Sequence, residues 1–373
     1  MMNEWIQPGK TIGIVGGGSV ARLLAFSAKK MGYKIGLLDP DPICSASNIA
    51  DWHLRADLTN EKAFRDLALK SDMVIYETEA FHTDYLRMMK RSLPVPQGED
   101  LLAISQDRVL QKAFLESHSI NIAPFATIVS MDDVHESVGS IGYPCVLKAN
   151  RTDERYRQHT VLYDDSDIEK TEDLLNSGAS VLEAWIPFER ELCIAIVKDS
   201  SGKILTYPVA EMMYRQDKFF QSIVPARIDY EVQQEVTRIA RIVAENIDFQ
   251  GVIALEILTT STGSLYVNEI VGHPHQAYHY TTDWAELSQY EAHIRAVCGW
   301  ALPEEIKTPS TSVMRLFNQN QLEEAYTQAR IQQDWKFTFY QGDPEDIYTE
   351  KGHLTVQTNN INQTVTLLSD IGM

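Results

Sequence analysis

The sequence predicts a protein of mixed α/β and α+β class with three domains, and three observations support this. Residues 11 to about 110 alternate short apolar segments with amphipathic segments of helical length, as in a parallel sheet. Residues from about 120 to 305 mix strands with helices, and a shorter region of strands around one helix follows. The 373 residues are enough for several hydrophobic cores. We therefore expect domains at residues 1–110, 111–305 and 306–373.

The first domain is expected to be Rossmann-like. Its strands and first helix are predicted in "TIGIVGG", "SVARLLAFSAKKMG", "YKIGLLDPD" and "SDMVIYET". Gly16, Gly18 and Ala21 have the G-x-G-x-x-A spacing of a dinucleotide-binding turn, and Asp39 closes the next strand. Two interpretations stay open: a tight strand-to-helix turn needs glycine whatever it binds, or backbone N–H groups at the helix start hold an anion.

The second and third domains are predicted from strand-like and helix-like segments. In the second, the expected strands are "APFATIVS", "YPCVLKA", "HTVLYDD", "ASVLEAWI", "ELCIAIVKD" and "ILTYPVAEM", and the expected helices are "MDDVHESVGSIG" and "DSDIEKTEDLLNSG". The turn "DSSGK" indicates a hairpin, hence antiparallel pairing. In the third, strands "SVMRLF", "WKFTFY" and "HLTVQT" surround a helix at "QLEEAYTQARIQQ".

A second hairpin carries the strongest chemical signal. The strands "GVIALEIL" and "SLYVNEIV" are separated by "TTSTG". Because side chains alternate along a strand, we expect Glu256 to share a face with Val252 and Ala254, and Glu269 to share one with Leu265 and Val267. Two carboxylates on apolar strand faces are costly to bury unless a cation lies between them, which favours Mg²⁺. The alternative is that one glutamate reaches solvent and the other pairs with an arginine.

Charge and composition exclude several classes of partner. The net charge is −19, and the sequence has no basic stripe of the kind that nucleic acid or an anionic membrane requires. No apolar run approaches the length of a membrane span, and the start has no signal-peptide pattern, so we expect a cytoplasmic protein. The cysteines form no C-x-x-C pair, so the sequence predicts neither a zinc site nor disulfides.

Taken in chain order, the features resemble a known family. Lys148 at a strand end, Glu183 in "VLEAWIPF", Glu191 and the E…N-E hairpin look like an ATP-grasp enzyme, although each residue alone is more often a surface charge than a ligand. More closely, the chain resembles the carboxyaminoimidazole ribonucleotide synthetase (PurK) family from end to end, in "TIGIVGGG", "LLDPD", "VIYET", "SQDR", "APF", "YPCVLK", "IVPARI", "YVNEI" and "GHLTV".

The resemblance implies a fold and a reaction. The expected fold is ATP-grasp, with a Rossmann-like pre-ATP-grasp domain before it and a small C-terminal domain after it, usually in a homodimer. ATP would phosphorylate bicarbonate to carboxyphosphate, and the amine of aminoimidazole ribonucleotide would capture the carboxyl group in a step of purine biosynthesis. The implied cofactors are ATP and Mg²⁺, with Mn²⁺ as an alternative metal.

The resemblance also assigns roles to residues. Glu256 and Glu269 would bind the metal. ATP would be bound by Arg108, Lys148, Glu183, Ile186, Glu191 and Asn268. The implied catalytic residues are Lys148, Arg157 and His273, of which His273 stands where the family has an arginine thought to orient bicarbonate. The amine substrate would be bound by Gly17, Ser19, Glu77, Glu79, His275, His279 and Lys351.

The chain departs from the family at the phosphate loop and the acceptor site. The family's glycine-rich loop is "TDERYRQH" here, where Arg155 and Arg157 would supply charge in place of backbone N–H groups. Ser19 replaces an amide, and the family's basic run near the C-terminus becomes Thr349, Glu350 and Lys351. Losing fixed cations weakens the binding of a phosphorylated substrate.

Four functions therefore stay open. The first is a working, divergent synthetase of this family. The second is an ATP-grasp ligase for another, unphosphorylated amine. The third is a nucleotide-binding protein with little or no turnover. The fourth, a nicotinamide-dependent oxidoreductase, rests on the glycine turn alone and leaves the metal hairpin unexplained.

Overall fold

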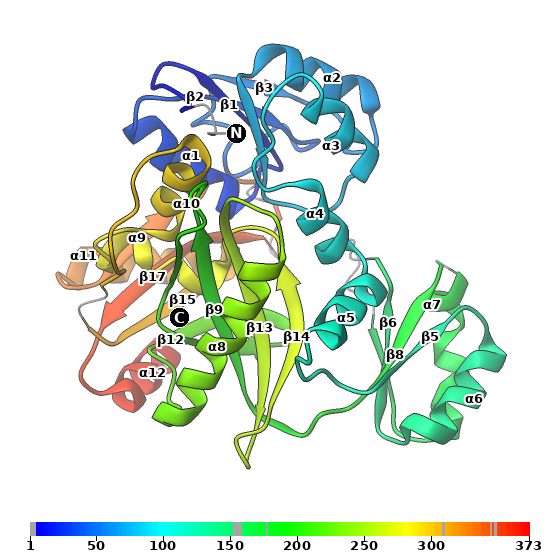
Figure 1. Ribbon diagram of the computed structural model, residues 1–373. Coiled ribbons are helices and arrows are strands. Elements are labelled where there is room, and N and C mark those ends of the chain that lie inside the picture. Colours follow the sequence, from blue (N-terminus) through cyan, green and yellow to red (C-terminus); the bar gives the residue numbers. More distant parts are fainter. Residues whose placement is uncertain (1–4, 152–158, 177, 308–309, 344, 347–348) are drawn as a thin grey trace.

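Figure 1 shows the computed structural model, which has one sheet in each of three regions. The structure describes residues 5–151, 159–176, 178–307, 310–343, 345–346 and 349–373. The N-terminal sheet lies at the top of the view, a small sheet lies on the right, and a large sheet runs through the centre. Among the described residues, none of the helices combines the length and apolarity that crossing a bilayer requires.

The N-terminal sheet is parallel and has the strand order β3-β2-β1-β4. Its strands are β1 (Thr11–Val15), β2 (Lys34–Leu38), β3 (Trp52–Leu54) and β4 (Met73–Tyr76), with helices α1 (Ser19–Lys30), α2 (Glu61–Lys70) and α3 (Thr83–Lys90). The core between α1 and the sheet also takes residues from α10 (Gln289–Cys298), much later in the chain. The Rossmann-like prediction is confirmed.

The small sheet is antiparallel, with order β5-β8-β6-β7. Its strands are β5 (Phe125–Ile128), β6 (Cys145–Ala149), β7 (His159–Leu162) and β8 (Ser180–Ala184). Helix α6 (Met131–Ile141) covers it, together with a 3₁₀ turn at Asp165–Thr171 that leads into α7 (Glu172–Asn176). Helices α4 (Glu99–Gln106) and α5 (Arg108–Ser117) connect it to the N-terminal sheet.

The large sheet has nine strands, in the order β14-β13-β9-β11-β12-β15-β17-β16, with β10 beside β9. They are β9 (Phe188–Lys198), β10 (Ile204–Thr206), β11 (Ala210–Arg215), β12 (Lys218–Val224), β13 (Gly251–Thr260), β14 (Leu265–Val271), β15 (Ser312–Asn318), β16 (Lys336–Phe339) and β17 (Glu350–Gln357). The predicted strand "ILTYPVAEM" is wrong as one element, because it divides into β10 and β11 on either side of Pro208, which lacks the N–H that a ladder needs.

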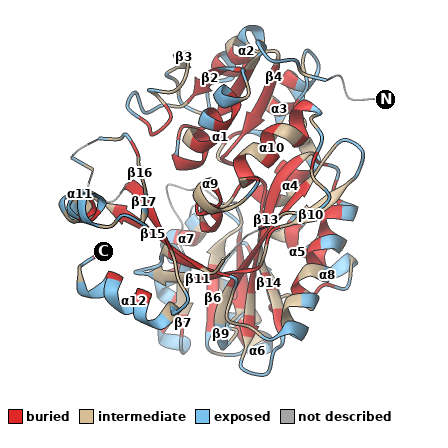
Figure 2. Cartoon of the chain, turned by 90° about the vertical axis from the view of Figure 1, so that its left-hand side faces the viewer, coloured by how far each residue is buried: buried red, intermediate tan, exposed pale blue. Residues whose placement is uncertain are grey.

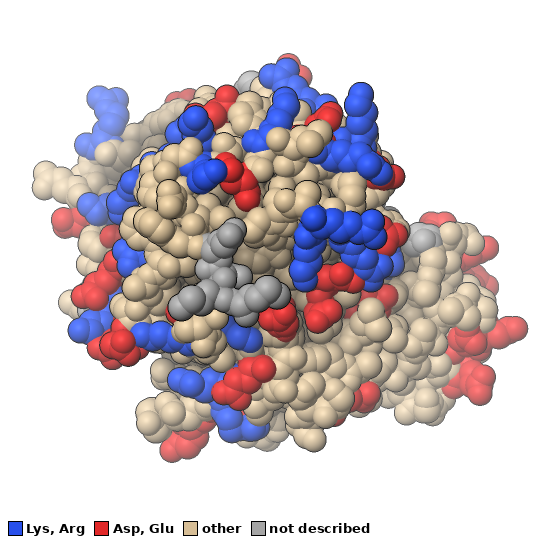
Figure 3. Space-filling view, turned by 45° about the horizontal axis from the view of Figure 1, so that its top comes forward, with Lys and Arg blue, Asp and Glu red and all other residues tan. Residues whose placement is uncertain are grey.

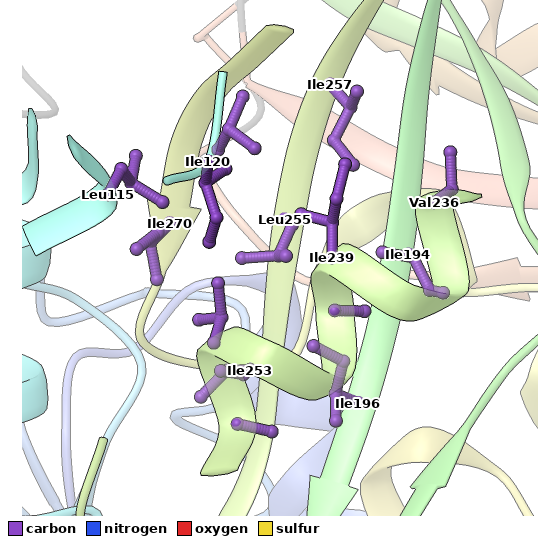
Figure 4. Packing of buried hydrophobic residues seen from close by; sticks show 14 of the residues in the cluster. Leu115, Ile120, Ile194, Ile196, Val236, Ile239, Ile253, Leu255, Ile257 and Ile270 are labelled. Atoms are coloured by element: carbon purple, nitrogen blue, oxygen red, sulfur yellow. The ribbon is translucent and has the colours of Figure 1, made fainter. Parts of the chain in front are cut away.

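Helices cover both faces of the large sheet. Helix α8 (Tyr230–Asn246) packs on one face, where Figure 4 shows Val236 and Ile239 against Ile253, Leu255 and Ile257 of β13. Near the other face lie α9 (Thr281–Trp284) and α10, and α11 (Leu322–Ile331) and α12 (Ile361–Asp370) pack at its C-terminal end. Figure 2 shows the strands buried and the outer helical faces exposed. Strand β12 pairs with β15, so the sheet continues across the predicted boundary at residue 305, and the three-domain division stays a prediction.

Candidate active site

A β-bulge shapes the hairpin of β13 and β14. Ile257 pairs with Val267 and Glu256 pairs with Glu269, so Asn268 has no partner in the ladder. The extra residue turns Glu269 to the same face as Glu256, whereas Leu265 and Val267 belong to the core on the opposite face. The predicted partners of Glu256 on its face are confirmed, since Val252 and Ala254 belong to the separate core on the Glu256 side of the sheet, together with Cys193, which pairs with Glu256. The expectation that Glu269 shares a face with Leu265 and Val267 is wrong, because strict alternation ignored the bulge.

Three carboxylates gather on this face of the sheet. Glu256 is buried, and its oxygen Oε1 lies 3.2 Å from Nε2 of His275. The backbone N–H of Ala277 donates to Nδ1 of His275, so a neutral His275 carries its proton on Nε2 and donates it to Glu256. Glu191 on β9 faces the same way, since it is two residues before Cys193, which pairs with Glu256. Burial and the charge of Glu256 raise the pKa of Glu191 to about 7.

The carboxylates fit a divalent cation. Glu256 and Glu269 are opposite each other, and Nη1 of Arg108 lies 3.8 Å from Oε2 of Glu269. Glu191 lies on the same face, so three carboxylates can supply oxygen ligands there. Hard oxygen ligands of this kind are those that Mg²⁺ prefers.

Cations lie across from the acidic face, around Glu183. Lys148 at the end of β6 is 3.0 Å from Oε2 of Glu183 and donates to Oδ1 of Asn268 over 3.2 Å. Lys112 of α5 is buried and lies 3.1 Å from the other oxygen of Glu183. Burial alone would raise the pKa of Glu183, but Lys148, Lys112 and Arg108 lower it to about 2. Sequence reasoning missed Lys112, although its spacing of four residues from Arg108 puts both on one face of a helix.

The start of α5 is clamped to the end of β6. The Asn150 side chain accepts from Val109 N–H at 3.0 Å and donates to Asp107 at 2.9 Å. Nε of Arg108 donates to the carbonyl of Ala149 over 3.1 Å. The clamp holds Arg108 near Lys148 and Glu269. Ile186 lies in the connection from β8 to β9, partly buried.

A second set of polar groups meets at the β1–α1 turn. Gly16 has a φ of 102°, and a side chain there would press on Glu77, so the tight turn needs glycine whatever it binds. Oε1 of Glu77 accepts from the N–H of Gly18 at 2.7 Å. Glu79 accepts from Gly272 N–H at 3.0 Å, and its Oε2 is 3.4 Å from Nε2 of His273. The turn thus binds a carboxylate of the protein itself.

Residues from three regions of the chain meet beside this turn. Ser19 at the start of α1 donates to Oε2 of Glu350 over 3.2 Å, and Nε2 of Gln276 is 3.0 Å from both oxygens of Glu350. Burial raises the pKa of Glu350. Lys351 is buried, with its ammonium group on the carbonyl of Asp343.

The remaining predicted site residues have diverse surroundings. His279 is fully buried among Tyr290, Tyr340 and His353, and burial followed by the neighbouring His353 lowers its pKa well below the usual value. The carbonyl of Gly17 accepts from Ala46 N–H at 3.0 Å. Arg157, like Arg155, lies outside the described residues. None of the predicted roles in binding or catalysis is tested by these positions, and they stay predictions.

Comparisons with known proteins agree with this layout. The family model of the ribonucleotide synthetase preATP-grasp domain matches residues 9–106, and that of the ATP-grasp domain matches residues 113–290. The chain is 36% identical over 302 residues to the N5-carboxyaminoimidazole ribonucleotide synthase of Bacillus subtilis, covering 81% of this chain and 80% of the relative. It is 30% identical over 358 residues to that of Staphylococcus aureus strain MRSA252, covering 95% of each.

Solved structures give the same result. The crystal structure of an ADP complex of PurK, N5-carboxyaminoimidazole ribonucleotide synthetase, has a TM-score of 0.94 and 31% identity, and the match covers 100% of this chain and 98% of that one. The N5-carboxyaminoimidazole synthetase of Staphylococcus aureus complexed with ADP has a TM-score of 0.91 and 28% identity, covering 98% of each chain.

Proposed function

The chain belongs to the N5-carboxyaminoimidazole ribonucleotide synthase family, and we propose from this premise that it carboxylates aminoimidazole ribonucleotide with bicarbonate at the expense of ATP. It is an ATP-grasp ligase that uses ATP and Mg²⁺. The observation that carries the proposal is the bulged hairpin, which sets Glu256 and Glu269 opposite each other and beside Arg108 and Lys148.

The reaction implied by the family proceeds in two displacements. An oxygen of bicarbonate attacks the γ-phosphorus of ATP, and ADP leaves. The amine nitrogen then attacks the carbonyl carbon of carboxyphosphate, phosphate leaves, and the nitrogen loses a proton. Glu256 and Glu269 would hold Mg²⁺, which would supply positive charge to stabilise the transferred phosphoryl group. No further co-reactant is needed.

We assign the protein's own groups in that chemistry as follows. Lys148 and Arg108 neutralise phosphate oxygens, and Asn268 and Glu183 hold the Lys148 ammonium in place. We assign His273 to bicarbonate from its place in the family resemblance; its Nδ1 lies 2.9 Å from the carbonyl oxygen of Pro274 and its Nε2 lies 3.4 Å from Oε2 of Glu79. Glu191 and Ile186 contact the nucleoside, and Gly17, Ser19, Glu77 and His275 contact the amine substrate.

The function is tested by measuring ADP release with ATP, Mg²⁺ and bicarbonate, with and without aminoimidazole ribonucleotide. We expect the ribonucleotide to stimulate release and the carboxylated product to form in equal amount. ADP release that the ribonucleotide leaves unchanged would contradict the proposed acceptor.

A second candidate function is favoured by Glu350. The carboxylate beside Ser19 and Gln276 puts negative charge where the family resemblance expects cations for the substrate's phosphate. An ATP-grasp enzyme with an unphosphorylated amine as acceptor would not meet this repulsion. Aminoimidazole riboside, which lacks the phosphate, distinguishes the two: the second function predicts that the riboside stimulates ADP release more than the ribonucleotide does.

We also propose a homodimer in the cytoplasm, with domain boundaries near residues 110 and 305. The family resemblance supports the first two points. The boundary near residue 110 is supported by the two family models, which meet between residues 106 and 113. Light scattering during size-exclusion chromatography tests the dimer, which should give twice the 42.3 kDa of the chain.

A further inference from the structure

A cluster of three metal-binding side chains lies at the edge of the N-terminal sheet, away from the hairpin carboxylates. Asp39 follows β2, His53 is in β3, and Cys44 is in the loop between them. One ligand atom from each residue lies within 4.8 Å of those of the other two. No other group of this kind occurs among the residues that the structure describes.

The local fold holds the three side chains in place. Oδ1 of Asp39 accepts from Asp41 N–H at 2.9 Å, and the N–H of Cys44 donates to the carbonyl of Asp41 at 3.3 Å. Cys44 is only 6% exposed, so its sulfur is held against the sheet edge. Gly17 packs directly on the cluster, since a Cβ at that position would be 2.4 Å from the Cys44 sulfur and 2.9 Å from Cγ of Asp39.

The histidine has the hydrogen bonding of a metal ligand. Nε2 of His53 is 3.0 Å from the carbonyl oxygen of Asp39. A carbonyl only accepts, so Nε2 carries the proton and Nδ1 has a lone pair. Nδ1 is buried and has no hydrogen-bond partner. Histidines that bind metals usually donate their other ring N–H to a carbonyl or carboxylate, which fixes the tautomer in this way.

We infer that Asp39, Cys44 and His53 form a site for one Zn²⁺ ion, separate from the Mg²⁺ site. A thiolate, an imidazole and a carboxylate are ligands that Zn²⁺ accepts together, whereas Mg²⁺ selects oxygen. Three protein ligands leave a fourth position for water or a ligand group. Sequence spacing gave no sign of the site, because the parallel pairing of β2 with β3 brings together residues 14 positions apart.

A reactive cysteine is the weaker explanation of the cluster. The Cys44 sulfur is buried between the sheet edge and Gly17, so a reactant in solution has little access to it. The site adjoins Gly17 in the β1–α1 turn, so a bound ion would brace the turn and the loop from residue 39 to 53.

The test uses the full chain, freed of metal by a chelator and titrated with Co²⁺ in excess Mg²⁺, which fills the hairpin site. We expect one equivalent of Co²⁺ to give a thiolate-to-metal charge-transfer band, and Zn²⁺ to displace it. Cys44→Ala should abolish the band and weaken Zn²⁺ binding at least about 100-fold, measured by competition with a chromophoric chelator. Cys145→Ala, at a buried cysteine of the small sheet, is the matched control and should bind as wild type.

His53→Gln is a second variant that tests the site while leaving the Cys44 thiol in place. It should retain the thiolate band and weaken Zn²⁺ binding about 10- to 100-fold. The site is refuted if wild type shows no charge-transfer band, if the band persists in Cys44→Ala, or if His53→Gln binds Zn²⁺ as tightly as wild type. The readout needs no ATP turnover, so its result is independent of the proposed function.

Discussion

At the scale of single residues, the ionisation of Glu191 makes the stability of the fold depend on pH. Its pKa is raised from 4.5 to about 7 by burial and Glu256. A folded pKa above the unfolded one means that the stability from this group is complete below about pH 4.5 and is lost as the pH rises through 7. Above pH 7, the ionised carboxylate therefore destabilises the fold.

Glu191→Gln should remove that penalty. We expect the free energy of unfolding to rise by about 1–3 kcal/mol at pH 8, and the gain to vanish near pH 4. Urea unfolding at both pH values measures this. Glu189→Gln, in which an exposed neighbour is neutralised, is the control and should show no such pH-dependent gain. An equal gain at both pH values would contradict the account.

Replacing Lys112 should lower the free energy of unfolding, in contrast to Glu191→Gln. Glu183 has a pKa of about 2, below its unfolded value of 4.5, so its contribution to stability is present above pH 4.5 and is lost as the pH falls through 2. Lys112→Met removes one of its two ammonium partners and should cost about 2–4 kcal/mol at pH 7. The acid-induced loss should begin at higher pH in the variant. Lys170, an exposed lysine paired with Asp167, is the control, and Lys170→Met should leave stability nearly unchanged.

Glu350 decides between the two candidate acceptors. If the ribonucleotide is the substrate, Glu350→Gln removes a like charge near its phosphate and should lower its KM about 10-fold, with kcat unchanged. If the acceptor is an unphosphorylated amine, the same variant should leave the KM for the riboside unchanged, because the riboside has no phosphate for Glu350 to repel. Glu345→Gln, at an exposed residue five positions earlier, is the control.

At the scale of elements, the clamp between α5 and β6 orients the phosphate-binding cations. Asn150→Ala removes its two side-chain hydrogen bonds, to Val109 and Asp107. We expect the KM for ATP to rise about 10-fold and stability to fall by about 1–2 kcal/mol. Steady-state kinetics with varied ATP measures the first effect. Asn246→Ala, at a solvent-exposed asparagine of α8, should leave the KM for ATP unchanged. An unchanged KM in Asn150→Ala would mean that the clamp does not position Arg108.

The hairpin shows how far the sequence predicts an element. Two apolar strands around "TTSTG" predicted β13 and β14, and the carboxylates predicted the metal chemistry. The bulge at Asn268 was not predictable, because one extra residue in the ladder leaves no periodic signal. Without it, Glu269 would face the core under α8. Lys112 was missed although its spacing from Arg108 puts both on one face of α5, because only the tertiary fold brings that face to Glu183.

At the scale of the whole molecule, composition and sequence pattern predict the kind of surface and the first domain, but not the pairing of distant strands. Figure 3 shows Lys and Arg side chains interspersed with Asp and Glu on the face that it presents. The alternation of strands and helices predicted the Rossmann-like domain. The nine-stranded sheet was not predicted, because pairs such as β12 with β15 join segments about 90 residues apart.

The meeting of Ser19, Gln276 and Glu350 is likewise a property of the whole chain. These residues come from the start of α1, the segment after β14 and the start of β17. The sequence marked Ser19 and Glu350 as departures from the family, but only the fold shows that they contact each other.

The most direct test of the central claim is ADP release by wild type and Glu269→Gln with ATP, Mg²⁺ and bicarbonate, with and without aminoimidazole ribonucleotide. We expect release that the ribonucleotide stimulates in wild type and that falls at least about 100-fold in Glu269→Gln, because the metal loses one of its two carboxylates. Glu189→Gln should retain wild-type rates. No release from folded wild type under either condition, or full activity in Glu269→Gln, would contradict an active carboxylase built on the bulged hairpin.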